Sequence, residues 1–109
     1  MKPSDQDKQI LGVLRQHGDT LTKPREIMHW AYFPSDEART RFAESCAKAG
    51  FAIRGMNDGA RMPNRFSVQF SHTDVPNENA VDLFRSLLTK LAAESGGEYD
   101  GWQTKIVQN

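Results

Sequence analysis

The stretch that organises this chain is residues 98–107, which read Glu98-Tyr99-Asp100-Gly101-Trp102-Gln103-Thr104-Lys105-Ile106-Val107. The run is typical of a short strand, and a glycine inside a strand pattern usually marks a bulge or a close backbone approach. Two interpretations of its aromatic residues are open. Tyr99 and Trp102 either cover the end of a small core, as large aromatics often do, or form a surface corner that presents Asp100 and one ring to a partner.

Length and charge indicate a single domain, residues 1–109, with no bulk affinity for nucleic acid. A chain of 109 residues is long enough for one domain with its own core and too short for two ordinary domains. Lys plus Arg and Asp plus Glu each number 14, so the formal net charge is zero. Proteins that bind nucleic acid through bulk charge are basic, so nucleic acid is not the expected partner.

The cysteine content and the N-terminal composition predict a cytoplasmic, bacterial-type protein. Cys46 is the single cysteine, so no intramolecular disulfide can form, and this fits a reducing compartment. Residues 1–7 are polar and lack the apolar segment of a signal peptide. No run approaches the roughly 20 apolar residues that a membrane span needs.

Residues 25–33 predict the central strand of a sheet. Side chains alternate between the two faces of a strand, which divides this run into two sets. One set is Ile27, His29, Ala31 and Phe33, and the other is Met28, Trp30 and Tyr32. Both sets are apolar or aromatic enough to be buried or half-buried, which favours a central position.

The remaining pattern predicts three helices and three further strands. The first helix begins after Ser4 and ends near Gly18, and the second is capped by Ser35 and ends at Gly50. Strands follow at residues 51–56 and 65–71, separated by the turn signal Asn57-Asp58-Gly59. The longest helix begins near Asp74 and Pro76 and ends at Ser95-Gly96-Gly97. Its predicted apolar stripe is Ala80, Leu83, Phe84, Leu87, Leu88 and Leu91.

This order of elements predicts an α+β fold of the ferredoxin-like type. After an N-terminal helix and linker (residues 1–24), residues 25–109 follow the order βαββαβ. Two right-handed βαβ units joined by a hairpin give a four-stranded antiparallel sheet with two helices on one face. The first and third strands then lie in the middle and the last strand at an edge. The other face would carry Met28, Trp30, Tyr32, Ser67 and Gln69, covered in part by the leading helix or by a partner.

No residue pattern points to catalysis, to a metal or to a cofactor. His17, His29 and His72 have no Cys, His or acid at zinc-ligand spacing, and His29 is expected to be a satisfied structural histidine. Cys46 lies on an apolar helix stripe, where a small buried hydrophobe is expected. The chain has neither a glycine-rich phosphate loop nor a nucleophile elbow. We therefore expect a protein that is not an enzyme.

Two surface features leave an RNA-binding alternative open. Arg54, Arg61 and Arg65 flank the predicted hairpin and would form a local basic patch. Trp30 and Tyr32 on a sheet face are similar to the base-stacking aromatics of RNA-recognition motifs. Against this, the third strand offers Ser67, Gln69 and Ser71 on that face, where such a motif needs aromatics.

The chain resembles the regulator of ribonuclease E activity B family over about residues 8–107. The most specific part of the resemblance is Tyr99-Asp100-Gly101-Trp102, which opens the last strand in that family. The second part is the strand-to-helix passage ending in Phe33, with acids at Asp36 and Glu37, which closes on Gly50-Phe51. The third is the leading helix, Ile10-Leu11-Gly12-Val13-Leu14, which ends in Gly18-Asp19. The resemblance implies a ferredoxin-like fold with an extra N-terminal helix. It also implies a protein that binds ribonuclease E and modulates its activity with no chemistry of its own.

Three functions are therefore carried forward. The first is a non-enzymatic regulator that binds a protein partner, by resemblance ribonuclease E. Its predicted contact residues are Tyr99, Asp100, Gly101, Trp102, Trp30 and Tyr32, chosen because exposed aromatics at an edge strand suit hot spots and strand addition. The second is an RNA-binding module that uses the open sheet face and the arginine patch. The third is an uncharted enzyme or small-ligand binder, which would need a deep pocket. A homodimer through an edge strand is also open.

Overall fold

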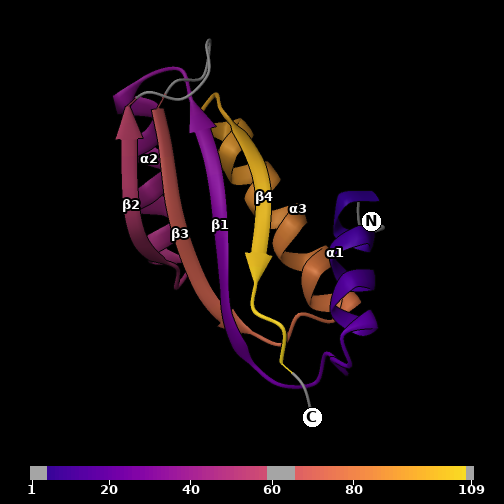
Figure 1. The fold of residues 1–109 in the computed structure, drawn as a ribbon. Coiled ribbons are helices and arrows are strands. Elements are labelled where there is room, and N and C mark those ends of the chain that lie inside the picture. The colour runs from indigo at the N-terminus through magenta and orange to yellow at the C-terminus, as the bar shows by residue number, and fades with distance from the viewer. Residues whose placement is uncertain (1–4, 59–65, 108–109) are drawn as a thin grey trace.

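The computed structural model describes residues 5–58 and 66–107 and contains three helices and four strands within them (Figure 1). The elements, in chain order, are α1 (Asp5–Gln16), β1 (Arg25–Phe33), α2 (Asp36–Lys48), β2 (Ala52–Asp58), β3 (Phe66–Asp74), α3 (Glu78–Glu94) and β4 (Glu98–Thr104). This is an α+β architecture, as the sequence predicts. The expected cap Ser4 and the turn residue Gly59 lie outside the described residues.

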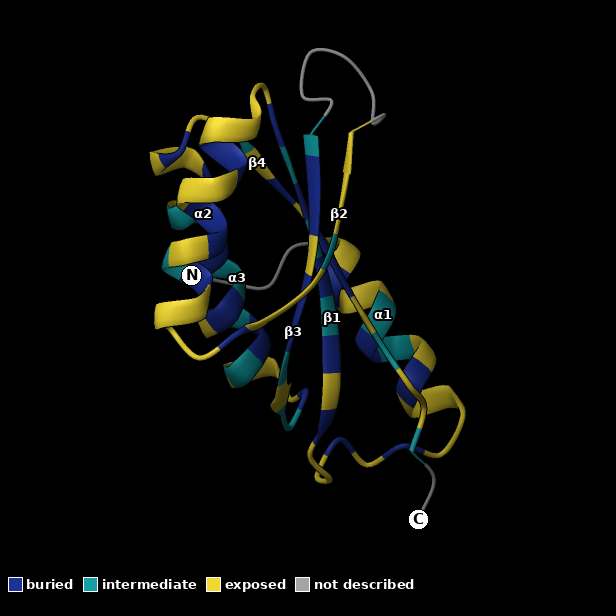
Figure 2. Ribbon diagram, turned by 90° about the vertical axis from the view of Figure 1, so that its left-hand side faces the viewer, coloured by how far each residue is buried: buried dark blue, intermediate teal, exposed yellow. Residues whose placement is uncertain are grey.

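The four strands form one antiparallel sheet in the order β2-β3-β1-β4. The first and third strands are central and β4 is at an edge, as predicted. Helices α2 and α3 lie on the same face of the sheet (Figure 2). Helix α1 lies beyond the β4 edge beside α3, so none of the three helices described covers the other face of the sheet (Figure 1). Among the described residues, no helix is long and apolar enough to cross a membrane.

The core lies between the sheet and the helices. The inward set of β1 is completely buried, and Val68 and Phe70 of β3 join it. Phe42 of α2 packs against Phe33 and Phe70, with ring centroids 4.8 and 5.3 Å apart. The outward set of β1 is half-buried. The alternation of burial along β1 therefore follows the predicted faces.

Two helix boundaries follow from side-chain capping. Ser35 accepts a hydrogen bond from the backbone N–H of Ala38, which confirms it as the cap of α2. The cap of α3 is Asn77, whose side chain accepts from the N–H of Ala80. The prediction that α3 begins near Asp74 is wrong, because β3 continues through Asp74 before the helix starts.

The buried stripe of α3 also differs from the predicted one. Val81, Phe84, Leu88 and Ala92 are buried, whereas Leu83 and Leu87 are 72% and 41% exposed. The helix is rotated so that Arg85 lies next to α1 and β4, where it pairs with Asp7. An apolar pattern alone cannot show that one arginine will be drawn toward the core by a buried carboxylate.

Candidate partner-binding face and the network beneath it

A bulge in β4 sets the geometry of the Tyr99–Trp102 stretch. Trp30 of β1 lies opposite Gly101, but the next residue, Ala31, lies opposite Tyr99, so Asp100 is the extra residue. Residues three apart in a regular strand point to opposite faces. The extra residue places both Tyr99 and Trp102 on the core face. Gly101 has a φ of +145°, which L side chains rarely adopt, and this explains the glycine.

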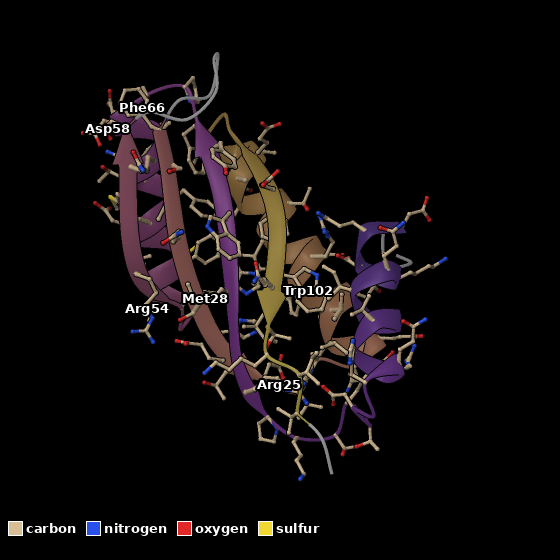
Figure 3. The ribbon with its side chains drawn as sticks, in the orientation of Figure 1. Arg25, Met28, Arg54, Asp58, Phe66 and Trp102 are labelled. Atoms are coloured by element: carbon tan, nitrogen blue, oxygen red, sulfur yellow. The ribbon has the colours of Figure 1, made fainter. Side chains whose placement is uncertain are left out.

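Burial of Tyr99 and Trp102 corrects the assumption that their rings are exposed. Only 9% of Tyr99 and 4% of Trp102 is accessible. Trp102 lies between β4 and the helices (Figure 3), with its ring edge-to-face against Phe84 at 5.5 Å. This burial fits the interpretation in which Tyr99 and Trp102 cover the end of the core. Their direct contact with a partner stays a prediction that this burial disfavours.

A buried carboxylate from α1 anchors this corner. Asp7 is fully buried and accepts a hydrogen bond from Trp102 Nε1 at 2.7 Å. It also accepts two hydrogen bonds from Arg85, from Nη2 at 2.6 Å and from Nε at 3.0 Å. Burial opposes the charge on Arg85, but Asp7, together with weaker effects of Tyr99 and Asp100, more than offsets it and raises the pKa of the guanidinium. Asp7 thus ties α1, α3 and β4 together.

A second polar chain runs through the core beside the bulge. His29 Nδ1 is 2.8 Å from the Tyr99 hydroxyl, and His29 Nε2 is 2.9 Å from His72 Nδ1. His72 Nε2 in turn lies 3.5 Å from a carboxylate oxygen of Asp74. Burial lowers the pKa of His29 to about 3 and raises that of Tyr99. His29 is therefore a satisfied structural histidine, as predicted.

The uncovered face of the sheet carries half-buried aromatics that line surface hollows. Trp30 and Tyr32 line a hollow of about 380 Å³ together with Gly55 and polar groups of β2 and β3. A second hollow of about 320 Å³ lies between the same two rings and the Asp100–Gln103 segment. A third, of about 360 Å³, contains Met28 and Trp30. A face of this kind has room for side chains of a partner on both sides of the Trp30 ring.

Two carboxylates lie beside these rings. Glu98 is directly opposite Tyr32 across β1 and β4 and so points to the uncovered face. Glu98 and Asp100 are exposed, and within the described residues neither side chain makes a hydrogen bond or an ion pair. Of the six predicted contact residues, the structure thus brings Trp30, Tyr32 and Asp100 together at the surface. Tyr99, Gly101 and Trp102 lie beneath or within the bulge.

The predicted arginine patch is only partly within the described residues. Arg61 and Arg65 lie outside them. Arg54 is the extra residue of a second bulge, between Ile53 and Gly55, and it lies near Met28 on the sheet (Figure 3). Its Nη2 pairs with Glu26, and its Nε donates to Ser71 Oγ at 3.0 Å. Arg54 is thus held by Glu26 and Ser71 on the sheet, and its part in a basic patch stays a prediction.

Two findings within residues 5–58 and 66–107 concern metal binding and thiol chemistry. No group of three or more His, Cys, Asp or Glu in these ranges could hold a metal ion. Cys46 is a buried residue of α2, and burial raises the pKa of its thiol to about 12, so it is not a reactive thiolate.

Sequence reasoning missed Asp7, Arg85 and His72. Asp7 reads as an acid that suits the first turn of a helix, and Arg85 reads as a solvated arginine. The available signal was Trp102 itself, because a buried indole N–H needs an acceptor. A buried Tyr99 likewise requires a polar neighbour, and His29 on the core face was the candidate.

The family assignment rests on a match over nearly the whole described chain. No curated protein is similar enough to count as a match to this sequence. A family model, Regulator of ribonuclease activity B, matches residues 4–104, which include all three helices and all four strands. The match includes the Tyr99–Trp102 bulge, its Asp7 anchor and the aromatic face of β1. The chain therefore belongs to the Regulator of ribonuclease activity B family.

Proposed function

We propose that this protein is a cytoplasmic regulator of RNA degradation that binds ribonuclease E and modulates its activity without catalysing a reaction. Family membership supports regulation of a ribonuclease, and the resemblance of the Tyr99–Trp102 stretch supports ribonuclease E as the partner. The strand order β2-β3-β1-β4, with α2 and α3 on one face, supports a ferredoxin-like fold for the binding module.

The uncovered sheet face is the observation that carries this proposal. Trp30 and Tyr32 form its centre, and Trp and Tyr are the residue types most enriched among energetic hot spots of interfaces. Asp100 and Glu98 stand at its rim as unpaired carboxylates, where charged groups typically steer association and fix register. We assign direct contact to Trp30, Tyr32 and Asp100. Tyr99, Gly101 and Trp102 act by holding Asp100 in place.

The test compares two double variants in a cleavage assay. Wild-type protein is titrated into ribonuclease E acting on a short fluorogenic RNA, and the change in cleavage rate is recorded. The Trp30→Ala, Tyr32→Ala variant removes both rings from the open face. The Leu83→Ala, Leu87→Ala variant is the matched control, since it removes two exposed apolar side chains from α3, which covers the opposite face.

We expect the wild type and the α3 variant to change the rate equally. The open-face variant should need at least about tenfold more protein for the same effect, because hot-spot truncations cost about 2 kcal/mol or more. If both folded double variants change the cleavage rate with equal potency, the open face is not part of the interface. No effect of the wild type on ribonuclease E would contradict the proposed function itself.

A further inference from the structure

The buried chain Tyr99–His29–His72–Asp74 has one consistent direction of hydrogen bonding when both histidines are neutral. A neutral imidazole has one N–H donor and one acceptor nitrogen. The Asp74 carboxylate only accepts, so His72 carries its proton on Nε2 and offers Nδ1 as an acceptor. His29 must then donate from Nε2 to His72 Nδ1, which leaves His29 Nδ1 to accept from the Tyr99 hydroxyl.

A single added proton reverses this direction. His72 is the ring open to protonation, because its side chain is 16% exposed whereas His29 is completely buried. Once His72 carries protons on both nitrogens, His29 Nε2 has to become the acceptor. The His29 proton then moves to Nδ1 and points at the Tyr99 oxygen. The Tyr99 hydroxyl can no longer donate to His29, and no other hydrogen bond involves it within the described residues.

The charged groups around these four residues act differently at the two ends. Asp74 favours a positive charge on His72, whereas Arg85 disfavours a positive charge on His29. Burial lowers the pKa of His72, and Asp74 of β3, which faces this ring, partly offsets the effect by stabilising the protonated form. On α3, the Arg85 guanidinium lies 4.9 Å from the centre of the Tyr99 ring and disfavours charge on His29. Burial raises the pKa of Tyr99, Arg85 opposes this effect, and the carboxylates of Asp7 in α1 and Asp100 in β4 add to it. Two uncharged rings also contact His29. Phe51 lies between α2 and β2, and Phe84 lies in α3.

We propose that protonation at the His72–Asp74 end reverses the hydrogen bonds of this chain and thereby loosens the β4 bulge from Tyr99 to Trp102. The chain links a partly exposed carboxylate at the end of β3 to the residue that precedes Asp100. A buried hydroxyl that loses its acceptor destabilises the conformation that buries it, and β4 is an edge strand held on one side only. If the protein binds its partner as proposed above, this loosening would also make partner binding depend on pH, and that step rests on the proposed function. The loosening of the β4 bulge itself does not.

The test is a pH titration followed by NMR on the isolated protein. Ring nitrogen shifts report the tautomer of each histidine, and amide hydrogen exchange, corrected for its intrinsic pH dependence, reports the opening of β4. Spectra are recorded between about pH 7.5 and pH 4.5, the range in which histidine titrates. We expect both rings to carry the proton on Nε2 at the upper end. As His72 becomes doubly protonated, His29 should change to the Nδ1–H form in the same step.

The protected amides of β4 should then exchange at least about fivefold faster than those of α2, as expected for a local opening. A His29 ring that keeps its Nε2 proton while His72 titrates would overturn the inference. Unchanged exchange in β4 would overturn it as well. Neither readout requires ribonuclease E, so failure of the switch is distinguishable from failure of the proposed function.

Three variants sharpen the result. His72→Asn keeps an acceptor, Asn Oδ1, at the position of Nδ1 and cannot be protonated, so its β4 exchange relative to that of α2 should be independent of pH. His17→Asn, at an exposed site after α1, is the matched control and should respond as the wild type does. Asp74→Asn keeps both histidines and should shift the His72 step and the β4 response together to lower pH. A shift of one without the other would contradict the coupling.

Discussion

Trp102 of the last strand donates its indole N–H to the carboxylate of Asp7 in the first helix, across 95 positions of the chain, at 2.7 Å. Because Asp7 also accepts two hydrogen bonds from Arg85, one buried carboxylate fixes how α1, α3 and β4 meet. This explains how a short N-terminal helix without a wide apolar stripe is held beside the sheet.

Replacing Asp7 should be among the most destabilising single changes in this chain. Asp7→Asn removes the charge that pairs with Arg85, whose side chain is 15% exposed. Loss of one partner from a buried ion pair costs about 3–5 kcal/mol of unfolding free energy, measured by urea denaturation. Asp5→Asn is the control, since Asp5 is exposed in the same helical turn and should change stability by less than about 0.5 kcal/mol. Equal effects of the two variants would contradict the anchoring role of Asp7.

Glycine at position 101 should be required by the backbone of the bulge. An alanine there would have to adopt a φ of +145°, and strained conformations of this kind cost about 1–3 kcal/mol. Gly12 in α1 is the matched control, because its φ is ordinary and an added Cβ would meet no atom within 4 Å. We expect Gly101→Ala to lower the midpoint of thermal unfolding and Gly12→Ala to raise it, since alanine favours a helix by about 1 kcal/mol. Two shifts of the same sign would contradict this account of the bulge.

The stability of the protein should fall as the pH drops below about 6.5. Burial lowers the pKa of His29 to about 3, whereas an unfolded histidine titrates near 6.5. Its contribution is therefore complete above pH 6.5 and is lost progressively as the pH falls towards 3. The slope is about 1.4 kcal/mol per pH unit for one proton. Urea denaturation at several pH values gives this slope. Protonation of the His29 ring near pH 6.5 in the folded protein would contradict its burial.

A buried ion pair should hold the segment after β4 against the α1–β1 linker. Asp19 accepts hydrogen bonds from Arg25 and from the backbone N–H of Val107, and the Arg25 bond in particular lowers the pKa of Asp19 to about 2. This stabilisation is present above about pH 4 and is lost as the pH falls through 2. Asp19→Asn should cost about 3–5 kcal/mol and speed hydrogen exchange at Val107. Glu37→Gln, at an exposed i,i+4 pair, is the control and should change neither the unfolding free energy nor the exchange rate of Val107. A Val107 amide that exchanges without protection in the wild type would contradict the role of Asp19 in holding this segment.

Alternation and capping made much of the fold predictable. The two faces of β1, its central position and the Ser35 cap all follow from local patterns, because each depends on the period of the backbone or on one side-chain hydrogen bond. The family was also recognisable from Tyr99-Asp100-Gly101-Trp102. What local patterns could not give is the direction of those two rings, since an extra residue in β4 changes the face that each ring occupies.

The polar network was unpredictable for a related reason. Asp7, Arg85 and Trp102 are brought together by the packing of α1 and α3 against β4, and no spacing in the sequence relates them. The same network keeps Arg85 beside the core, and Leu83 and Leu87 are consequently exposed. The candidate contact face was predictable at Asp100, and at Trp30 and Tyr32, whose alternation places them on the outward side of β1.

Direct binding to purified ribonuclease E, measured by calorimetry at low and at physiological salt, tests the central claim most directly. A chain with zero net charge and an aromatic contact face should bind saturably at both salt concentrations, with an affinity that changes little between them. The Trp30→Ala, Tyr32→Ala variant should bind at least about tenfold more weakly. Absence of binding by the folded wild type at either salt concentration would contradict the account.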